Sequence, residues 1–102
     1  DILTMWTFSP LQTATVDTNG DQWTNAPETY VTNGPFKVAE LNMGESVVLV
    51  KNPNHGAGGT VKQEKVTLRY ITDQGTSLMA YEGGEIDGMS TIPSSDYARL
   101  KA

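Results

Sequence analysis

An alternation of apolar and polar residues in the middle of the chain constrains its fold more than any other feature. Phe36 and Val38 share one face of a predicted strand, and strict period two would put Leu41 on the opposite face. Turn residues at 42–45 then separate this strand from the β-branched run 46–51, which suits a strand covered on both sides. The two segments therefore predict a β-hairpin.

A third alternating segment, 66–71, predicts another strand that pairs antiparallel with a neighbour. Residues 76–82 predict a short helix capped by Thr76, and residues 85–89 read as a short returning strand. Pro93 begins a second short helix over 96–101. We therefore expect an α+β fold with a small mixed, mostly antiparallel sheet: a hairpin, a third strand and a β-α-β return, with two short helices.

The part of the chain before this unit is predicted to be irregular or weakly helical. Ser9, Pro10 and Gly20 stand where the cap, first turn and stop of a helix would fall, although the threonines between them favour helix poorly. Trp23 and Tyr30 are expected to anchor the following irregular stretch by packing. The resulting organisation is a single domain, 1–102, made of a lead-in over 1–33 and a β-β-β-α-β-α unit over 34–102.

Composition limits both the core and the partners. Leu, Ile, Val and Phe make up 21 of the 102 residues, just above the level of about 20% below which chains tend toward disorder, so the core should be thin. No cysteine is present, which excludes disulfides and thiolate metal sites. A net charge of −5 argues against nucleic acid as a partner. We expect no membrane span and no signal peptide, and interpret the start at Asp1 as that of a processed or excised chain.

Residues that could carry chemistry are few, and each has a simpler interpretation. His55 is the single histidine, and it lies in a loop. The acidic residues Glu82, Glu85 and Asp87 fit solvated groups near a helix end better than a glycosidase pair. The segment 17–21 resembles the start of a calcium loop but has its glycine at the wrong position. We therefore predict no catalytic residues, no metal ligands, no cofactor and no enzymatic activity.

Several short motifs follow one another along the chain. They are Pro27 to Val38, which includes the corner Asn33-Gly34-Pro35, then Gly44 to Asn54, Val66 to Ile71, Ala80-Tyr81-Glu82 and Gly84-Glu85-Ile86-Asp87. In this order they resemble the oligopeptide-binding proteins, the extracytoplasmic solute-binding family 5 receptors of ABC importers. The resemblance extends from about Trp6 to Lys101, so it is specific in aggregate although each motif is short.

The resemblance implies that this chain is part of a lobe of a larger periplasmic-binding-protein type II receptor. It implies an extracytoplasmic parent, periplasmic or lipid-anchored at the cell surface, with a peptide or small solute as ligand and an ABC permease as partner. It also implies that Met89, Ser90, Thr91 and Ile92 face the binding cleft. An ordinary loop between two elements is the alternative for these four residues.

Some residues depart from the family pattern, and these departures leave three hypotheses for the chain itself. His55-Gly56 stands where the family has two aromatic residues, which removes anchors from that loop. Because one lobe cannot enclose a ligand, we expect weak peptide binding or none in isolation. The alternatives are an engineered or excised structural subdomain that self-associates and, less favoured, a small carbohydrate-binding module that uses Trp6 or Trp23. The sequence does not identify the ligand or the oligomeric state.

Overall fold

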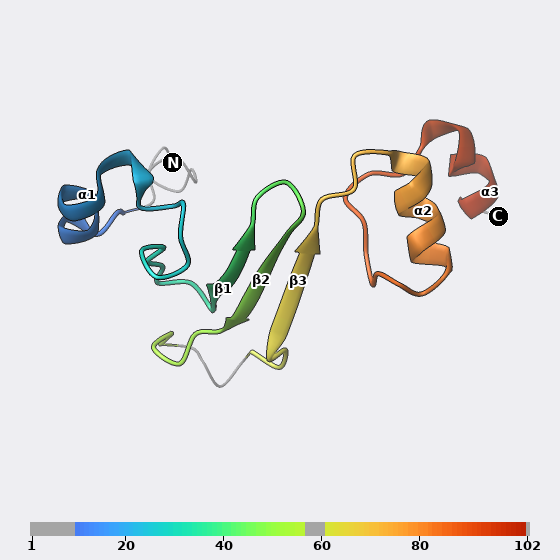
Figure 1. Ribbon diagram of the computed structural model, residues 1–102. Coiled ribbons are helices and arrows are strands. Elements are labelled where there is room, and N and C mark those ends of the chain that lie inside the picture. Colours follow the sequence, from blue (N-terminus) through green and yellow to red (C-terminus); the bar gives the residue numbers. More distant parts are fainter. Residues whose placement is uncertain (1–9, 57–60, 102) are drawn as a thin grey trace, which may run out of the picture. The chain divides into compact units, whose positions relative to one another are not determined.

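The computed structural model describes residues 10–56 and 61–101 (Figure 1). The chain divides into two compact units, Asp1–Leu68 and Arg69–Ala102. In chain order the elements are α1 (Thr13–Asn19), η3 (Gly20–Gln22), β1 (Phe36–Asn42), β2 (Ser46–Lys51), β3 (Lys65–Arg69), α2 (Gln74–Glu82), η5 (Ser94–Asp96) and α3 (Tyr97–Lys101). The predicted α+β class is confirmed.

The lead-in to the sheet is helical for two turns. Helix α1 begins after Gln12, so the prediction of a helix starting at Pro10 is wrong by three residues, and Ser9 lies outside the described residues. The helix ends at Gly20, as predicted. Gly20 has a φ of 54°, and its N–H donates to the carbonyl of Val16, an arrangement that a side chain at this position would strain.

The predicted hairpin is present. Strands β1 and β2 pair antiparallel from Phe36 opposite Lys51 to Asn42 opposite Ser46. The tight turn between them contains Gly44 at a φ of 77°, and it is closed by a 3.0 Å bond from the N–H of Glu45 to the carbonyl of Asn42. Strand β3 adds to β2 on its other side, which gives an antiparallel three-stranded sheet in the order β1-β2-β3 (Figure 1).

A β-bulge at Ala39 changes the faces of β1. Val38 lies opposite Leu49, whereas Glu40 lies opposite Val48, so Ala39 is the extra residue. Residues on either side of a bulge lose strict period two. Leu41, opposite Val47, therefore joins the face of Phe36 and Val38, and these three are the half-buried residues of the strand. The prediction that Leu41 lies on the opposite face is wrong for this reason.

The returning strand predicted at 85–89 is absent. All five of these residues are described, and they are irregular. The N–H of Glu85 donates to the carbonyl of Ala80 and so completes the end of α2 instead of a strand ladder. Asp87 and Gly88 favour strands poorly. The sheet is consequently antiparallel throughout and lacks the parallel pair that a β-α-β return would create.

Helix α2 is defined by its two ends. Its N-cap is Asp73, not the predicted Thr76: the Asp73 carboxylate accepts a 2.7 Å bond from the N–H of Thr76 and a 2.6 Å bond from its hydroxyl. At the other end Gly84 has a φ of 75°, and its N–H donates to the carbonyl of Tyr81. Together with the Glu85 bond to Ala80, this is a Schellman motif.

The core is thin, as the composition predicts. In the described part of the chain the buried apolar residues are Val47, Val48 and Leu78, and no side chain is fully buried. Val47 and Val48 lie on opposite faces of β2, so this strand is covered on both sides at its centre. The stability of this chain therefore depends to an unusual degree on hydrogen bonds and turn geometry.

Candidate functional site

The four residues predicted to face ligand lie in an irregular segment between α2 and η5, which we call loop 83–93. Met89 is half-buried, whereas Ser90 and Thr91 are exposed, and Ile92 is 43% exposed. Ser90, Thr91 and Ile92 are thus exposed at the surface of the second unit. Their contact with a ligand stays a prediction.

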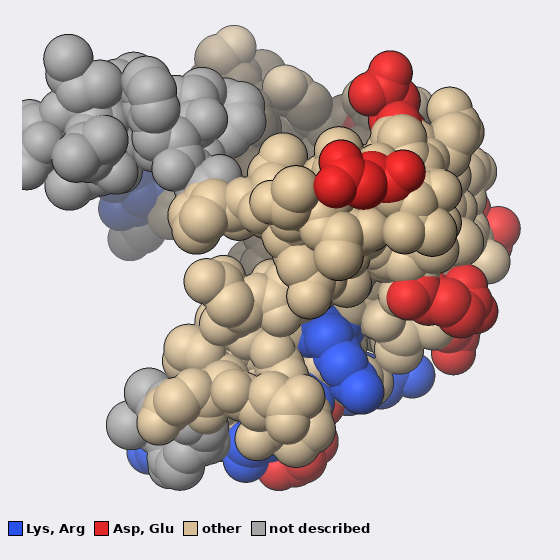
Figure 2. Space-filling model, turned by 90° about the vertical axis from the view of Figure 1, so that its left-hand side faces the viewer, with Lys and Arg blue, Asp and Glu red and all other residues tan. Residues whose placement is uncertain are grey.

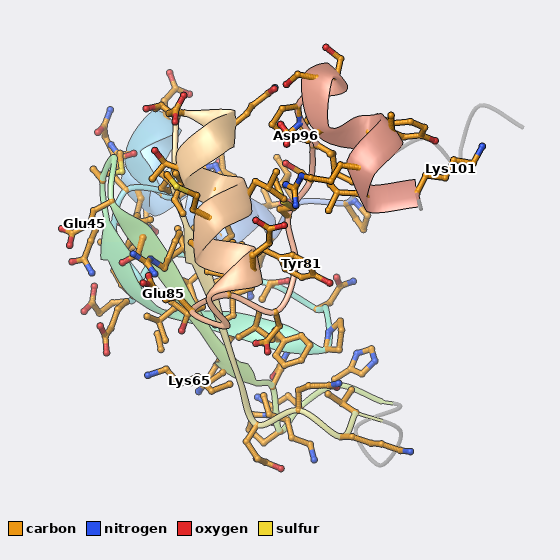
Figure 3. All side chains as sticks on the ribbon, turned by 90° about the vertical axis from the view of Figure 1, so that its right-hand side faces the viewer. Glu45, Lys65, Tyr81, Glu85, Asp96 and Lys101 are labelled. Atoms are coloured by element: carbon orange, nitrogen blue, oxygen red, sulfur yellow. The ribbon has the colours of Figure 1, made fainter. Side chains whose placement is uncertain are left out.

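Both ends of loop 83–93 are held by named contacts. At its start, the Schellman motif fixes Gly84 and Glu85, and the Glu85 carboxylate lies 3.6 Å from the guanidinium of Arg69. At its end, the N–H of Asp96 donates a 3.0 Å bond to the carbonyl of Pro93. Figure 3 shows Glu85 beyond the C-terminal end of α2 and Asp96 at the start of the last helical segment.

One arginine joins the two sides of this loop. Arg99 Nη1 lies 2.6 Å from Glu82 Oε1, and its Nε and Nη2 lie 3.3 Å and 3.1 Å from Asp96 Oδ1. The hydrogen bonds that the guanidinium donates to Glu82, and then to Asp96, raise the pKa of Arg99 above its already high ordinary value. The arginine is therefore charged at every pH of interest.

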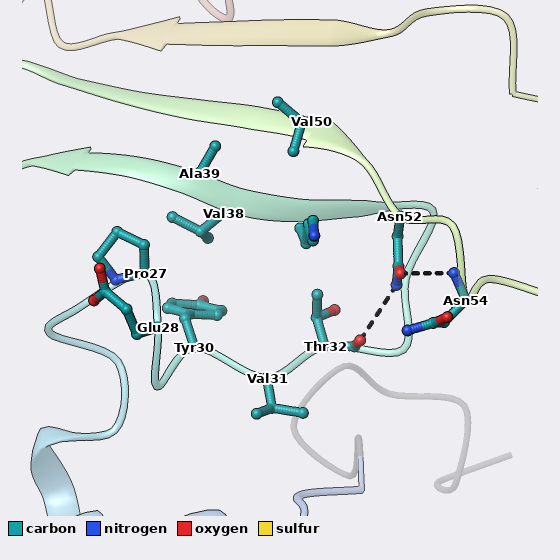
Figure 4. Close-up of a pocket in the computed structure, with 11 residues that line it drawn as sticks. Pro27, Glu28, Tyr30, Val31, Thr32, Val38, Ala39, Val50, Asn52 and Asn54 are labelled. Carbon is teal, nitrogen blue, oxygen red and sulfur yellow. Dashed lines mark hydrogen bonds between the residues drawn. The ribbon is translucent and has the colours of Figure 1, made fainter.

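A second candidate region is an open cavity of about 560 Å³ in the first unit (Figure 4). Tyr30 and Thr32 line it from the segment before β1, and Lys37 and Val50 line it from the hairpin. Both polar and apolar side chains line it. The complete lining is Pro27, Glu28, Tyr30, Val31, Thr32, Lys37, Val38, Ala39, Val50, Asn52 and Asn54.

Asn52, at the edge of this cavity, ties the chain before β1 to the end of β2. Its side-chain N–H groups donate to the carbonyls of Gly34 at 2.8 Å and Thr32 at 3.4 Å, and its side-chain oxygen accepts from the N–H of Asn54 at 3.1 Å. Its own N–H donates to the carbonyl of Pro35 at 2.9 Å. The sequence around Asn52 indicates only the end of a strand and does not reveal this set of contacts.

The remaining candidates of the sequence analysis have structural contacts. His55 Nδ1 lies 3.1 Å from the carbonyl of Asn33, a hydrogen bond that the Nδ1–H tautomer donates. Glu82 and Glu85 are engaged with arginines. Trp23 packs on Tyr30 at a centroid distance of 5.4 Å, whereas Trp6 lies outside the described residues. Across residues 10–56 and 61–101, no three His, Cys, Asp or Glu side chains come together as a metal site.

Figure 2 shows one face of the molecule, on which Asp and Glu side chains stand at several separate places beside a few Lys and Arg. Among the described helices, none has the length and apolar character needed to cross a membrane.

Comparison with known proteins identifies the class to which this fold and loop belong. Residues 2–102 match the model of the bacterial extracellular solute-binding proteins, family 5 Middle. The chain therefore belongs to the bacterial extracellular solute-binding proteins of family 5, and the family predicted from its motifs is confirmed.

Individual relatives are oligopeptide-binding proteins. The chain is 30% identical over 105 residues to the oligopeptide-binding protein OppA of Bacillus subtilis, an alignment that covers 99% of this chain and 19% of that protein. It is 32% identical over 94 residues to the periplasmic OppA of Salmonella typhimurium, with 91% and 17% covered. The chain thus spans about a fifth of the length of the relatives it matches.

Solved structures agree with this fold. A periplasmic oligopeptide-binding protein of Borrelia burgdorferi superimposes with a TM-score of 0.91 at 28% identity, over 99% of this chain and 20% of that one. Haemophilus influenzae OppA, solved in complex with RPPGFSPFR, gives a TM-score of 0.81 at 28% identity, over 90% of this chain and 18% of that one.

Proposed function

We propose that this chain forms part of one lobe of an extracytoplasmic receptor that delivers peptides to an ABC permease. The observation that carries the proposal is the combined match of family, over residues 2–102, and of fold, over 90% of the chain, to an oligopeptide-binding protein solved with a peptide. The relatives named here are binding proteins, which supports a receptor without enzymatic activity. The names of several relatives also support a periplasmic or cell-surface location for the parent.

Within that lobe, we assign peptide contact to Met89, Ser90, Thr91 and Ile92. Ser90 and Thr91 are exposed and carry hydroxyls that donate and accept hydrogen bonds, as an extended peptide backbone requires. Ile92 adds exposed apolar surface beside them. Because the loop is irregular, its backbone forms no sheet hydrogen bonds, and its ends are held in place by the contacts described above.

A graft tests both the receptor role and this assignment. Replacing the matched segment of Bacillus subtilis OppA with this chain should preserve peptide binding, measured by calorimetry. In the graft, Thr91→Ala combined with Ile92→Ala should weaken binding about tenfold, which corresponds to about 1.4 kcal/mol. The matched control is Thr67→Ala with Leu68→Ala, a similar exposed pair on β3, which should leave the affinity unchanged.

Two results would contradict the proposal. A graft that folds, as judged by cooperative thermal unfolding, but binds no peptide would exclude the receptor role. Equal losses in the two double variants would remove the assignment to loop 83–93 and leave the receptor role standing.

The chain by itself should bind peptides weakly or not at all. Receptors of this type gain affinity by enclosing the ligand between two lobes, and the chain spans about a fifth of its relatives. Titration of the chain with peptides in a calorimeter should give no affinity in the micromolar range. Micromolar binding would show that one lobe segment is sufficient.

A structural role is the second candidate, favoured by the apolar side chains exposed in the second unit. The side chains of Tyr70, Met79 and Tyr97 are 59%, 66% and 61% exposed. Exposed apolar side chains that form a contiguous patch are typical of surfaces that contact a partner. As a stand-alone subdomain the chain would then cover them by self-association. Sedimentation velocity over a range of concentrations distinguishes a dimer from a monomer.

The carbohydrate-binding hypothesis has gained no support. Trp23 is half-buried and packed on Tyr30, so its ring face is partly occupied. Quenching of tryptophan fluorescence by oligosaccharides would be required to revive this hypothesis.

A further inference from the structure

Loop 83–93 contains no helix or strand, so its shape depends on how its ends are held. The first end is fixed by backbone bonds of the Schellman motif at Gly84 and Glu85. The second end leads through η5 into α3, a helix of five residues. Helices this short are unstable without contacts to other parts of the fold, so something outside α3 must hold it.

Arg99 supplies that contact. It lies on α3, and its Nη1 is 2.6 Å from Oε1 of Glu82, the last residue of α2. Its Nε and Nη2 both reach Asp96 Oδ1. One guanidinium therefore connects the residue just before loop 83–93 with the helical segment just after it.

The geometry requires arginine rather than a general positive charge. Three N–H groups of the planar guanidinium serve two carboxylates at once, and a lysine ammonium cannot reproduce this fork. Asp96 holds the guanidinium from its own helical segment, which leaves Nη1 directed to Glu82. The ion pair to Glu82 is thus pre-oriented within the second unit.

We propose that Arg99 is a positioning residue for peptide binding: by pairing with Glu82 it closes loop 83–93 and fixes the backbone that presents Met89, Ser90, Thr91 and Ile92. This inference rests on the proposed function of those four residues, but the ordering of the loop can be measured without any ligand. Exposed ion pairs change a local equilibrium only a few-fold, which is sufficient to alter the order of an irregular loop without unfolding the unit.

The test is NMR relaxation of the backbone amides in this chain. In the wild type, residues 89–92 should have order parameters near the rigid value of about 0.85. In Glu82→Gln and Arg99→Gln these order parameters should be measurably lower. Arg99→Lys should give an intermediate value. Salt at about 1 M, where the screening length is about 3 Å, should move the wild type in the same direction.

The chain offers a matched control in its first unit. Lys51 Nζ lies 3.5 Å from Glu64 Oε1, so Glu64→Gln neutralises a glutamate of an ion pair remote in sequence from the loop, and it should leave residues 89–92 unchanged. Amides of β1 and β2 should keep their shifts in every variant, which verifies folding. Unchanged order of residues 89–92 in Glu82→Gln would overturn the inference even if grafted receptors bind peptide. An ordered loop whose residues make no peptide contact in the graft would instead overturn the assignment of peptide contact to residues 89–92.

Discussion

At the scale of single residues, Asn52 has the largest structural role that the described residues show. It is 5% exposed and is the buried polar residue of that part of the chain. Its amide donates to the backbone before β1 and accepts from the backbone after β2. Because the chain has so few buried apolar residues, these hydrogen bonds contribute stability that a larger core would otherwise supply.

Replacement of Asn52 by Ala should therefore lower the free energy of unfolding by about 2–3 kcal/mol. The carbonyl of Gly34 and the N–H of Asn54 lose their partner, and a buried polar group left unpaired costs about 1–3 kcal/mol. Asn52→Asp keeps the acceptor for Asn54 but places a carboxylate against the Gly34 carbonyl, so it should destabilise as well. Urea unfolding measures both changes.

Asn54→Ala is the control for this series. Asn54 is exposed, and the contact that ties it to Asn52 uses its backbone N–H, which the substitution keeps. Its free energy of unfolding should stay within about 0.5 kcal/mol of the wild type. An Asn52→Ala protein as stable as Asn54→Ala would mean that the amide contributes nothing.

No sequence pattern could have predicted the partners of Asn52. The side chain bonds to Gly34, eighteen residues earlier, and the pairing depends on where β1 and β2 end relative to each other. Gly20 as a helix stop and the turn at Gly44 were predictable because their signals are local. The same distinction applies to Arg99, whose bond to Glu82 spans seventeen residues.

At the scale of elements, local sequence patterns predicted the positions of β1, β2, β3 and α2. They did not predict features that depend on contacts between elements. The bulge at Ala39 arises from pairing with β2 and leaves no mark in the sequence of β1 alone. The segment 85–89 contains the apolar residues Ile86 and Met89 and reads as a strand in isolation. In the structure, however, the N–H of Glu85 donates to the carbonyl of Ala80 at the end of α2. This hydrogen bond cannot be predicted from the alternation pattern.

The cap of α2 makes a prediction about acid. Hydrogen bonds from the Thr76 hydroxyl, and then from the Thr76 N–H, lower the pKa of the Asp73 carboxyl below its ordinary value. Because the folded pKa is lower than the unfolded one, about 3.9, the stabilisation is complete well above pH 3.9. It is lost as the pH falls through the lowered folded value. Carbon chemical shifts of residues 74–82 should therefore report loss of helix in strong acid.

Asp73→Asn separates this effect from general acid unfolding. Asparagine also caps helices but does not titrate, so the helical shifts of α2 should change less with pH in this variant. Asp73→Ala should lower them at every pH. An identical acid transition in wild type and Asp73→Asn would show that another group controls the end of α2.

At the scale of the whole molecule, the described surface includes many large apolar side chains. Large apolar side chains stand exposed in both units. They are Leu11, Val31, Met43, Leu68, Tyr70, Met79, Tyr81, Ile92, Tyr97 and Leu100. Figure 3 shows Tyr81 on α2, on the unit that also carries loop 83–93. Because relatives are about five times longer, the remainder of the proposed receptor would cover such side chains outside loop 83–93 and β3.

If that cover is missing, the chain should associate with itself through the second unit. Met79 on α2 is 66% exposed, and burying a Met side chain contributes about 1.5–3 kcal/mol when complete. Met79→Gln should therefore weaken association about tenfold, the equivalent of about 1.4 kcal/mol, as measured by sedimentation equilibrium. The control is Met43→Gln in the hairpin turn, a methionine that is 75% exposed but belongs to the first unit. Equal weakening of association by both variants would indicate non-specific aggregation. A wild type that stays monomeric at millimolar concentration would contradict self-association and favour contact with the rest of a receptor as the reason for the exposed apolar side chains.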